Sequence, residues 1–371
     1  MPRPVLVLFS LLLVVSAWVE TPGGNGAGSL LPVSSSTQLQ AATNSSAATW
    51  TLPNGVQYPL LAINTADLSV EAVDRAVRLA WEHGVRSVDF HLGEEREGVS
   101  RALAAIPRQE LFLTTKLDKP PANMTDPAEA AALARRTLDD ELGALGATSV
   151  DMLLLKDSAT CEVMQAQWAV LEEMLVAGRT RALGTYNYCE FSLSCLLASA
   201  TTPPAVNYLM RHVGMGADAT GIIAFGAAHG IRTAAYGTLG EPVALPELLS
   251  SPTLHAIAEA HGRSVEEVGL RWNVQAGLAI SNRITADYAP DNAPPHGFCT
   301  EDCRAAIDAM AQVDAWALTE AEVAQLDAVR LEQYPQSPTY YSSTGCANSF
   351  GVSDHPTASA CSSSQSRSRW C

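Results

Sequence analysis

Four side chains able to share or transfer a proton fall near the ends of three apolar runs. They are Asp89 and His91 in the run 86–91, Lys116 in the run 111–117, and Lys156 at the end of the run 150–156. His91 stands two residues beyond Asp89, so the two side chains lie on the same side of an extended strand. If the three runs are neighbouring parallel strands, a carboxylate, an imidazole and two amines meet at one end of a sheet.

These residue types allow more than one chemistry. Two like charges in a partly buried site lower the pKa of one of them, and a lysine with a lowered pKa forms Schiff bases. Two charged lysines could instead bind an anion, or Glu94 and Glu95 could neutralise both. Lys116 with Asp89 is either a catalytic pair or a structural ion pair. The His91 imidazole either acts as a proton donor in catalysis or makes only a local hydrogen bond.

The three runs belong to a longer alternation of short apolar and longer amphipathic segments. Strands are predicted at 60–65, 86–91, 111–117, 150–156, 181–187, 205–211, 232–238 and 278–282. Helices are predicted at 70–84, 126–144, 162–177, 218–229 and 265–277. This alternation is typical of an α/β fold, the (β/α)8 TIM barrel of parallel strands. An open doubly wound sheet alternates similarly, but the Gly-x-Gly-x-x-Gly turn expected after its first strand is missing.

Turn and cap residues mark the boundaries of these elements. Asn54-Gly55 predicts an N-terminal β-hairpin between Trp50 and Tyr58, because this dipeptide tolerates positive φ. Ser264 predicts a helix N-cap, since acidic residues follow it in the first turn. Four glycines follow predicted helices, where a left-handed C-cap is favoured: Gly84, Gly143, Gly178 and Gly230.

Six segments carry a resemblance to one family. They are 54–65 (NGVQYPLLAINT), 84–90 (GVRSVDF), 111–117 (LFLTTKL), 178–187 (GRTRALGTYN), 234–240 (AAYGTLG) and 268–272 (VGLRW). Each motif is short, but their order and spacing over residues 50–330 resemble the aldo-keto reductases. The resemblance implies a barrel that transfers hydride from NADPH to a small carbonyl compound at the carboxyl ends of its strands.

The resemblance also implies roles for the residues at those strand ends. In the family, a tyrosine protonates the carbonyl oxygen, a lysine lowers that tyrosine's pKa, an aspartate pairs with the lysine, and a histidine orients the substrate. Asp89 matches the aspartate and Lys116 the lysine. Gly93 or Glu94 stands where the tyrosine is expected, and Lys156 where the histidine is expected. We therefore predict a site that no phenol reaches.

On the nicotinamide side, the resemblance implies a partly altered cofactor site. Asn187 matches one member of a Ser-Asn pair that holds the nicotinamide amide, and Tyr236 matches a tyrosine that stacks on the ring. Thr65 matches a residue near the nicotinamide. Tyr186 replaces the serine, and Tyr208 replaces a glutamine.

On the phosphate side, the departure from the family is larger. The last strand of the family carries a lysine that binds the 2′-phosphate of NADPH, and Asn282 stands there instead. Arg283 beside it is a candidate substitute. An insertion rich in Pro and Asp follows at 285–298. We expect NADP(H) binding to be weak or lost.

The ends of the chain predict a secreted protein. Arg3, an apolar stretch over 5–15 and a small-residue site near Ala17 are typical of a signal peptide over 1–17. A low-complexity leader is expected at 18–48, the barrel at 49–332, and a Ser/Thr-rich, Cys-containing tail at 333–371. We expect no integral membrane segment. In this compartment, Asn44-Ser45-Ser46 and Asn123-Met124-Thr125 are candidate N-glycosylation sites.

Charge and cysteine content narrow the classes of partner. The net charge of −16 argues against nucleic-acid binding. Eight cysteines in an oxidising compartment favour disulfides, and their spacing does not resemble a metal site. A Cys161–Cys189 bridge is slightly favoured over two buried thiols, because both residues follow strands on the same face of the predicted barrel.

Two functions remain open. The first is a divergent, NADP(H)-dependent oxidoreductase that reduces a small carbonyl compound with His91 or water as the acid. The second is a secreted pseudoenzyme, whose barrel binds a ligand or partner without turnover. The absence of the expected tyrosine and histidine leaves catalytic competence doubtful, and the predicted compartment favours the second function.

Overall fold

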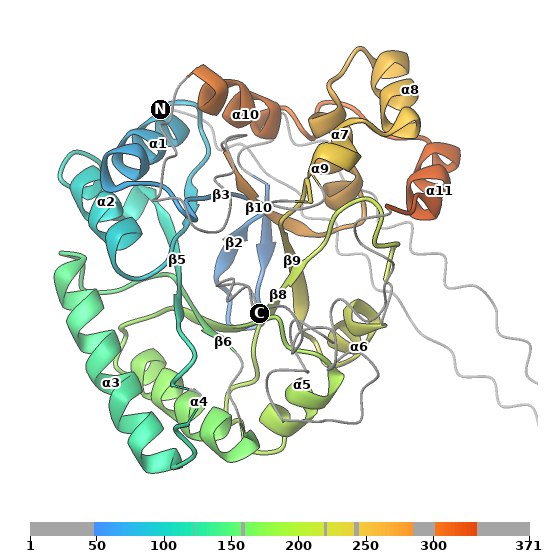
Figure 1. Ribbon diagram of the computed structural model, residues 1–371. Helices are drawn as coiled ribbons and strands as arrows, with labels where there is room; N and C mark the ends of the chain where they lie inside the picture. The colour runs from blue at the N-terminus through green and yellow to red at the C-terminus, as the bar shows by residue number, and fades with distance from the viewer. Residues whose placement is uncertain are drawn as a thin grey trace, which may run out of the picture. The chain divides into compact units, whose positions relative to one another are not determined.

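Eight parallel strands form a closed barrel (Figure 1). The computed structural model describes residues 48–121, 123–156, 160–218, 221–240, 245–284 and 301–331. The strands are β3 (Leu61–Asn64), β4 (Ser87–Asp89), β5 (Phe112–Leu117), β6 (Met152–Lys156), β7 (Ala182–Tyr186), β8 (Val206–Met210), β9 (Arg232–Tyr236) and β10 (Ala279–Arg283). Neighbours in sequence are neighbours in the sheet, and β10 pairs with β3 to close the ring. The predicted fold class is confirmed.

Helices follow the strands around the outside of the barrel (Figure 1). They are α1 (Val70–Glu82), α2 (Glu94–Leu103), α3 (Pro127–Ala144), α4 (Cys161–Val176), α5 (Glu190–Leu197), α6 (Ile222–Ala228), α7 (Leu245–Leu249), α8 (Pro252–His261), α9 (Val265–Gln275), α10 (Glu301–Ala311) and α11 (Glu320–Ala328), with a short 3₁₀ turn η2 (Arg108–Glu110). In α1, buried Ala72, Ala76 and Ala80 recur every four residues and form a stripe facing the barrel. The predicted N-cap of α9 is confirmed, because Ser264 and Glu267 form a reciprocal capping box.

The hairpin of β1 (Thr49–Thr51) and β2 (Gln57–Pro59) closes the amino-terminal end of the barrel. Tyr58 is almost fully buried, and its ring packs edge-on against Phe112 with 5.3 Å between centroids. Its hydroxyl group is hydrogen-bonded to the hydroxyl group of Tyr208 on β8. Gly55 has φ of 84°, the positive value on which the hairpin prediction was based.

One predicted glycine cap is wrong, and several predicted segments lie outside the described residues. Gly84, Gly178 and Gly230 have positive φ as expected, but Gly143 lies inside α3, and Gly146 takes the left-handed conformation instead. The Gly143 cap prediction is therefore wrong. The predicted signal peptide, leader, tail and 285–298 insertion lie outside the described residues, as does Asn44. Within the described ranges, no helix is both long and apolar enough to cross a membrane.

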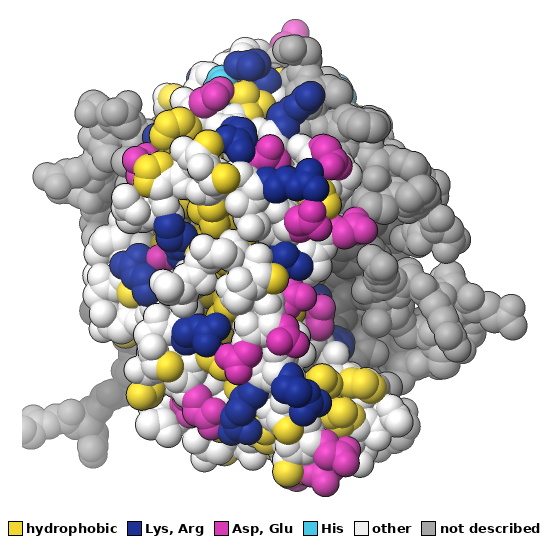
Figure 2. Space-filling view, turned by 90° about the vertical axis from the view of Figure 1, so that its left-hand side faces the viewer, with side chains coloured by type: hydrophobic (Ala, Val, Ile, Leu, Met, Phe, Trp, Pro, Cys, Tyr) yellow, Lys and Arg dark blue, Asp and Glu magenta, His cyan; other side chains and the backbone are white. Residues whose placement is uncertain are grey.

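The outer surface over the α1–α3 side mixes both signs of charge (Figure 2). Acidic and basic side chains alternate there, and ion pairs join neighbouring helices, such as Arg96 of α2 with Glu141 of α3 at 3.0 Å. Arg101 of α2 pairs with Glu71 of α1 at 2.9 Å. The exposed Arg101–Glu71 pair contributes little to stability, about 0–1 kcal/mol. The residues that could carry out catalysis lie instead at the carboxyl ends of the strands.

Candidate functional site

Asp89 and Lys116 form an ion pair at the carboxyl ends of β4 and β5. The Lys116 Nζ lies 2.5 Å from Asp89 Oδ1, and neither side chain has any exposed surface. Sheet register explains the meeting, because Asp89 pairs with Thr114 and Lys116 points to the same side two residues later. Lys116 also donates to the Phe90 carbonyl oxygen at 3.4 Å. The predicted juxtaposition of Asp89 and Lys116 is present.

Two further polar residues hold the second oxygen of Asp89. Ser281 Oγ on β10 donates to Asp89 Oδ2 at 2.5 Å, and Asn64 Nδ2 on β3 donates to the same atom at 3.2 Å. Both residues are buried. Residues of β3, β5 and β10 therefore contact one carboxylate of β4. Neither Asn64 nor Ser281 was predicted as a site residue from the sequence.

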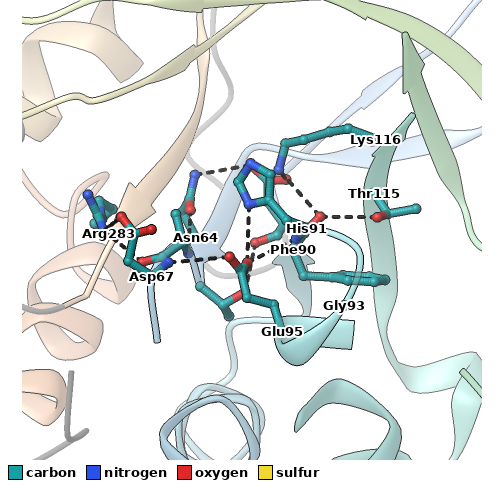
Figure 3. A network of polar contacts seen from close by, with 12 residues as sticks. Asn64, Asp67, Phe90, His91, Gly93, Glu95, Thr115, Lys116 and Arg283 are labelled. Carbon is teal, nitrogen blue, oxygen red and sulfur yellow. Dashed lines mark hydrogen bonds and ion pairs between the residues drawn. The ribbon is translucent and has the colours of Figure 1, made fainter. Parts of the chain in front are cut away.

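A second buried carboxylate, Glu95 at the start of α2, collects donors from the loops after β3 and β4 (Figure 3). Its Oε2 accepts from Thr65 Oγ1 at 2.9 Å and from the His91 backbone amide at 2.9 Å, with His91 Nδ1 at 3.2 Å. Its Oε1 accepts from the Asp67 amide at 3.3 Å. Burial alone would raise the pKa of Glu95, but His91 and the charge of Lys116 lower it to about 2.

Lys156, the last residue of β6, lies at the same end of the barrel with a different partner. Its Nζ is 2.5 Å from Asp118 Oδ1, and the lysine side chain is 20% exposed. Asp118 follows β5 directly and was not identified from the sequence. Neither suggested acid neutralises Lys156 there, because Glu94 is exposed and Glu95 binds Thr65 and His91.

A phenol does reach this site, and the contrary prediction is wrong. Tyr186, the last residue of β7, is buried, and its ring centroid lies 5.8 Å from Lys116 Nζ and 5.8 Å from Lys156 Nζ. The ring stacks on Tyr236 of β9, with 4.8 Å between centroids and 20° between planes. Both lysines therefore contact one aromatic ring. From the sequence, Tyr186 was predicted only as the replacement for a serine in the nicotinamide site.

Asn187 and Tyr208 continue the polar and aromatic lining of the barrel. Asn187 adopts φ of 61°, a conformation that Asn tolerates, and its Nδ2 donates to the Tyr236 hydroxyl at 2.7 Å. Its Oδ1 is buried with no hydrogen-bond partner. Tyr208 lies deeper and fully buried, 6.5 Å from the Tyr186 ring. Burial raises the pKa of Tyr208 well above its usual value.

Arg283, the candidate phosphate ligand, is engaged within the chain. Its Nη2 lies 2.6 Å from Asp67 Oδ2 and donates to the Ala66 carbonyl oxygen at 2.7 Å. Its side chain is 12% exposed. Asn282 accepts a hydrogen bond from Thr238 at 2.6 Å. Figure 3 shows Arg283 and Asp67 facing each other beside the Glu95 cluster.

The cysteine pairing differs from the prediction. Cys161, at the start of α4, is bonded to Cys195 in α5, with 6.0 Å between Cα atoms. Cys189 is disulfide-bonded as well, so the predicted Cys161–Cys189 bridge is wrong. Cys195 lies in a helix that the sequence analysis did not predict, and this is why it was not considered as a partner.

Comparisons with known proteins agree on one family. The model of the "Aldo/keto reductase family" matches residues 60–330. An aldo-keto reductase of Mycolicibacterium smegmatis is 33% identical over 256 residues, covering 67% of this chain and 86% of the relative. Morphine 6-dehydrogenase of Pseudomonas putida is 32% identical over 294 residues, covering 74% of this chain and 89% of the relative.

Solved structures show the same fold. The aldose reductase from Schistosoma japonicum superposes with a TM-score of 0.63 at 18% identity, covering 83% of this chain and all of that chain. MGS-M4, an aldo-keto reductase from a deep-sea metagenome library, gives a TM-score of 0.64 at 21% identity, covering 76% and 95%. With the barrel, the Asp89–Lys116 pair and these matches in hand, we conclude that the chain belongs to the aldo/keto reductase family.

Proposed function

We propose that this barrel binds small carbonyl compounds in a secretory compartment without reducing them at the expense of NADP(H). The family's chemistry is carbonyl reduction, so the proposal concerns what this member has lost. One observation carries it: the Tyr186 ring is stacked on Tyr236.

The residues present do not fit a nicotinamide ring. The family resemblance places that ring on the face of Tyr236, and the Tyr186 ring lies there at 4.8 Å, a normal stacking distance. Tyr236 is only 6% exposed. A side chain with an aromatic ring has replaced the small serine expected at position 186. Nicotinamide could stack on this face of Tyr236 only after Tyr186 moved away.

The polar atoms expected to bind the rest of the cofactor are also engaged. Thr65 donates to Glu95, and Arg283 pairs with Asp67. A ligand phosphate would have to displace that carboxylate from the guanidinium. Asn187 retains an unpartnered buried oxygen, but its amide nitrogen is held by the Tyr236 hydroxyl. These contacts support weak or lost NADP(H) binding.

The tyrosine expected to protonate the carbonyl oxygen is missing from its usual position, and the Tyr186 ring near Lys116 is stacked on Tyr236. Glu94, at the position expected for the tyrosine, is exposed at the start of α2. The alternative reductase would use His91, which is 20% exposed and interacts with Glu95 at 3.2 Å. A reductase with His91 as acid still needs the nicotinamide beside it, so the Tyr186–Tyr236 stack argues against that function too.

The secretory location is part of the proposal. The Cys161–Cys195 disulfide supports it, because structural disulfides persist in oxidising compartments. Asn123 of the second sequon is exposed, as a glycosylated asparagine must be. Reduced nicotinamide cofactor is scarce outside the cytosol, which agrees with a barrel that does not depend on it.

A fluorescence titration with NADPH, followed by turnover with a panel of aldehydes, tests the proposal. We expect wild-type protein to bind NADPH weakly and to consume none measurably. Tyr186→Ser should tighten binding about tenfold or more, since a site closed most of the time has a correspondingly reduced apparent affinity. Tyr186→Phe is the matched control, because it keeps the ring. Tight binding with robust turnover by wild-type protein would refute the proposal.

A further inference from the structure

A sequence motif for covalent modification lies beside the candidate site. Asn123-Met124-Thr125 is an Asn-x-Thr sequon with no proline at its middle position. It belongs to the loop that joins β5 to α3, and the loops that follow the strands lie at the carboxyl-end face of a (β/α)8 barrel. The same loop begins with Asp118, which lies 2.5 Å from Lys156. The sequon is therefore on the rim of the barrel mouth, on its β5 side.

The sequon lies in a turn, outside any helix or strand. The Met124 amide donates to the Pro121 carbonyl oxygen at 2.8 Å, so Asn123 is at the tip of a tight turn. Helix α3 starts only after the sequon, because Asp126 is its N-cap and accepts from the Ala128 amide at 2.8 Å. An enzyme that modifies Asn123 therefore meets a backbone that helix or sheet hydrogen bonds do not hold.

The two residues that define the motif are accessible to solvent. Asn123 and Thr125 are both exposed, and Met124 between them is half-buried. A glycan is bulky and hydrated, and it therefore needs an attachment point at the surface. Asn123 meets this requirement without the movement of any buried group.

We propose that Asn123 carries an N-linked glycan that covers the β5 side of the barrel mouth. The inference rests on the proposed function, because the modification needs the secretory location. The Cys161–Cys195 disulfide supports that location independently of the sequon. Since the glycan is bulky, it keeps protein partners away from this side of the mouth. Small molecules remain as the ligand class, which agrees with small carbonyl compounds.

The modification uses one co-reactant, an oligosaccharide joined to a lipid through a diphosphate. A membrane-bound glycosyltransferase supplies it in the secretory compartment. The Asn123 Nδ2 atom forms a bond to C1 of the first sugar, and the bond between that carbon and the diphosphate oxygen breaks. The lipid diphosphate leaves with the electron pair of the broken bond, and the amide gives up one proton. Nothing is oxidised or reduced.

Mapping of the attached sugar tests the proposal. The full chain is expressed in eukaryotic cells and recovered from the medium. Peptide-N-glycosidase converts a glycosylated asparagine to aspartate as it releases the sugar, and peptide mass spectrometry locates the conversion. We expect conversion at Asn123 in wild-type protein and in Thr125→Ser, the matched control that keeps the sequon. Thr125→Ala should abolish the conversion, although Asn123 is still present.

Limited proteolysis examines the cover over the rim. Endoproteinase Asp-N cleaves before aspartate, and the exposed Asp126 directly follows the sequon. Thr125→Ala and Asn123→Gln lose the glycan in different ways, and both should be cut at Asp126 several-fold faster than wild-type protein. Thr125→Ser should be cut at close to the wild-type rate. Urea unfolding of each variant checks that the barrel is as stable as in wild-type protein.

The outcomes separate this inference from the proposed function. Secreted protein with an unmodified Asn123 would overturn the inference and leave the secretory location standing. Protein that stays in the cytosol would refute both. Equal cleavage at Asp126 in wild-type protein and all variants would show that no glycan covers the rim. NADPH binding is measured separately, so the loss of cofactor binding stands or fails without regard to the sugar.

Discussion

At the scale of single residues, two lysines on adjacent strands differ mainly in burial. Lys116 and Asp89 are fully buried, whereas Lys156 is 20% exposed and Asp118 is 58% exposed. A charge buried without its partner is strongly destabilising, while a partly solvated one is not. The same residue type therefore supports structure at one position and remains available to a ligand at the other.

The contrast predicts different stabilities for two matched substitutions. Lys116→Met should lower the free energy of unfolding by about 3–5 kcal/mol, because Asp89 would stay buried and unpaired. Lys156→Met should lower it by about 1 kcal/mol or less. Denaturant unfolding at neutral pH measures both. Equal losses for the two variants would contradict the burial argument.

Glu95 predicts a dependence of stability on pH. Its folded-state pKa is lowered from 4.5 to about 2, with burial opposing and His91 causing the decrease. The charged carboxylate therefore stabilises the fold above pH 4.5, and this contribution is lost as the pH falls from 4.5 toward 2. A shift of this size corresponds to about 3 kcal/mol.

Comparison of wild-type protein with Glu95→Gln isolates this contribution. The difference in unfolding free energy should be about 3 kcal/mol at pH 6 and should shrink steadily below pH 4.5. Unfolding in urea over this range measures it. A difference that stays constant with pH would show that Glu95 acts through packing or shape rather than charge.

Much of the site was predictable at this scale, and the exceptions have physical reasons. Asp89, His91, Lys116 and Lys156 were expected together, because each ends a strand and parallel strand ends converge. Tyr186 was predicted as a replacement in the cofactor site, but sequence alone does not give the direction of its ring. Asp118 lies in a loop, where no periodicity constrains a side chain.

At the scale of elements, strands were predicted more completely than helices. All eight barrel strands were found within two residues of their observed ends, because buried parallel strands are continuous apolar runs. Helix α2 was missed, since its buried residues are only Glu95, Gly98, Val99 and Ala102. So few apolar positions give no clear helical period.

Gly98 makes a close approach possible between α1 and α2. A Cβ added there would meet the Val73 side chain and, at 2.7 Å, the Val70 carbonyl oxygen. Gly98→Ala should therefore cost about 1–3 kcal/mol through overpacking. Gly143→Ala is the matched control inside α3, where nothing lies within 4 Å. It should stabilise by about 0.5–1 kcal/mol. Thermal unfolding compares them, and a neutral Gly98→Ala would contradict the tight contact.

At the scale of the whole molecule, the Cys161–Cys195 bond links α4 to α5 across 34 residues. Closing a loop of this length stabilises by about 3–4 kcal/mol in the chain-entropy estimate. We expect a Cys161→Ser, Cys195→Ser double variant to lose that amount in denaturant unfolding under oxidising conditions. With a reductant present, variant and wild type should unfold together. A difference that persists after reduction would point to packing of the sulfur atoms instead.

The ring closure between β3 and β10 has a consequence for biosynthesis. Leu61 pairs with Ile280, so a strand near the start of the barrel finds its second neighbour only after most of the chain has been made. Until then, the backbone amides and carbonyls along that side of β3 are an open template for other chains. We therefore expect newly made protein to be most prone to aggregation before β10 has been made and can pair with β3.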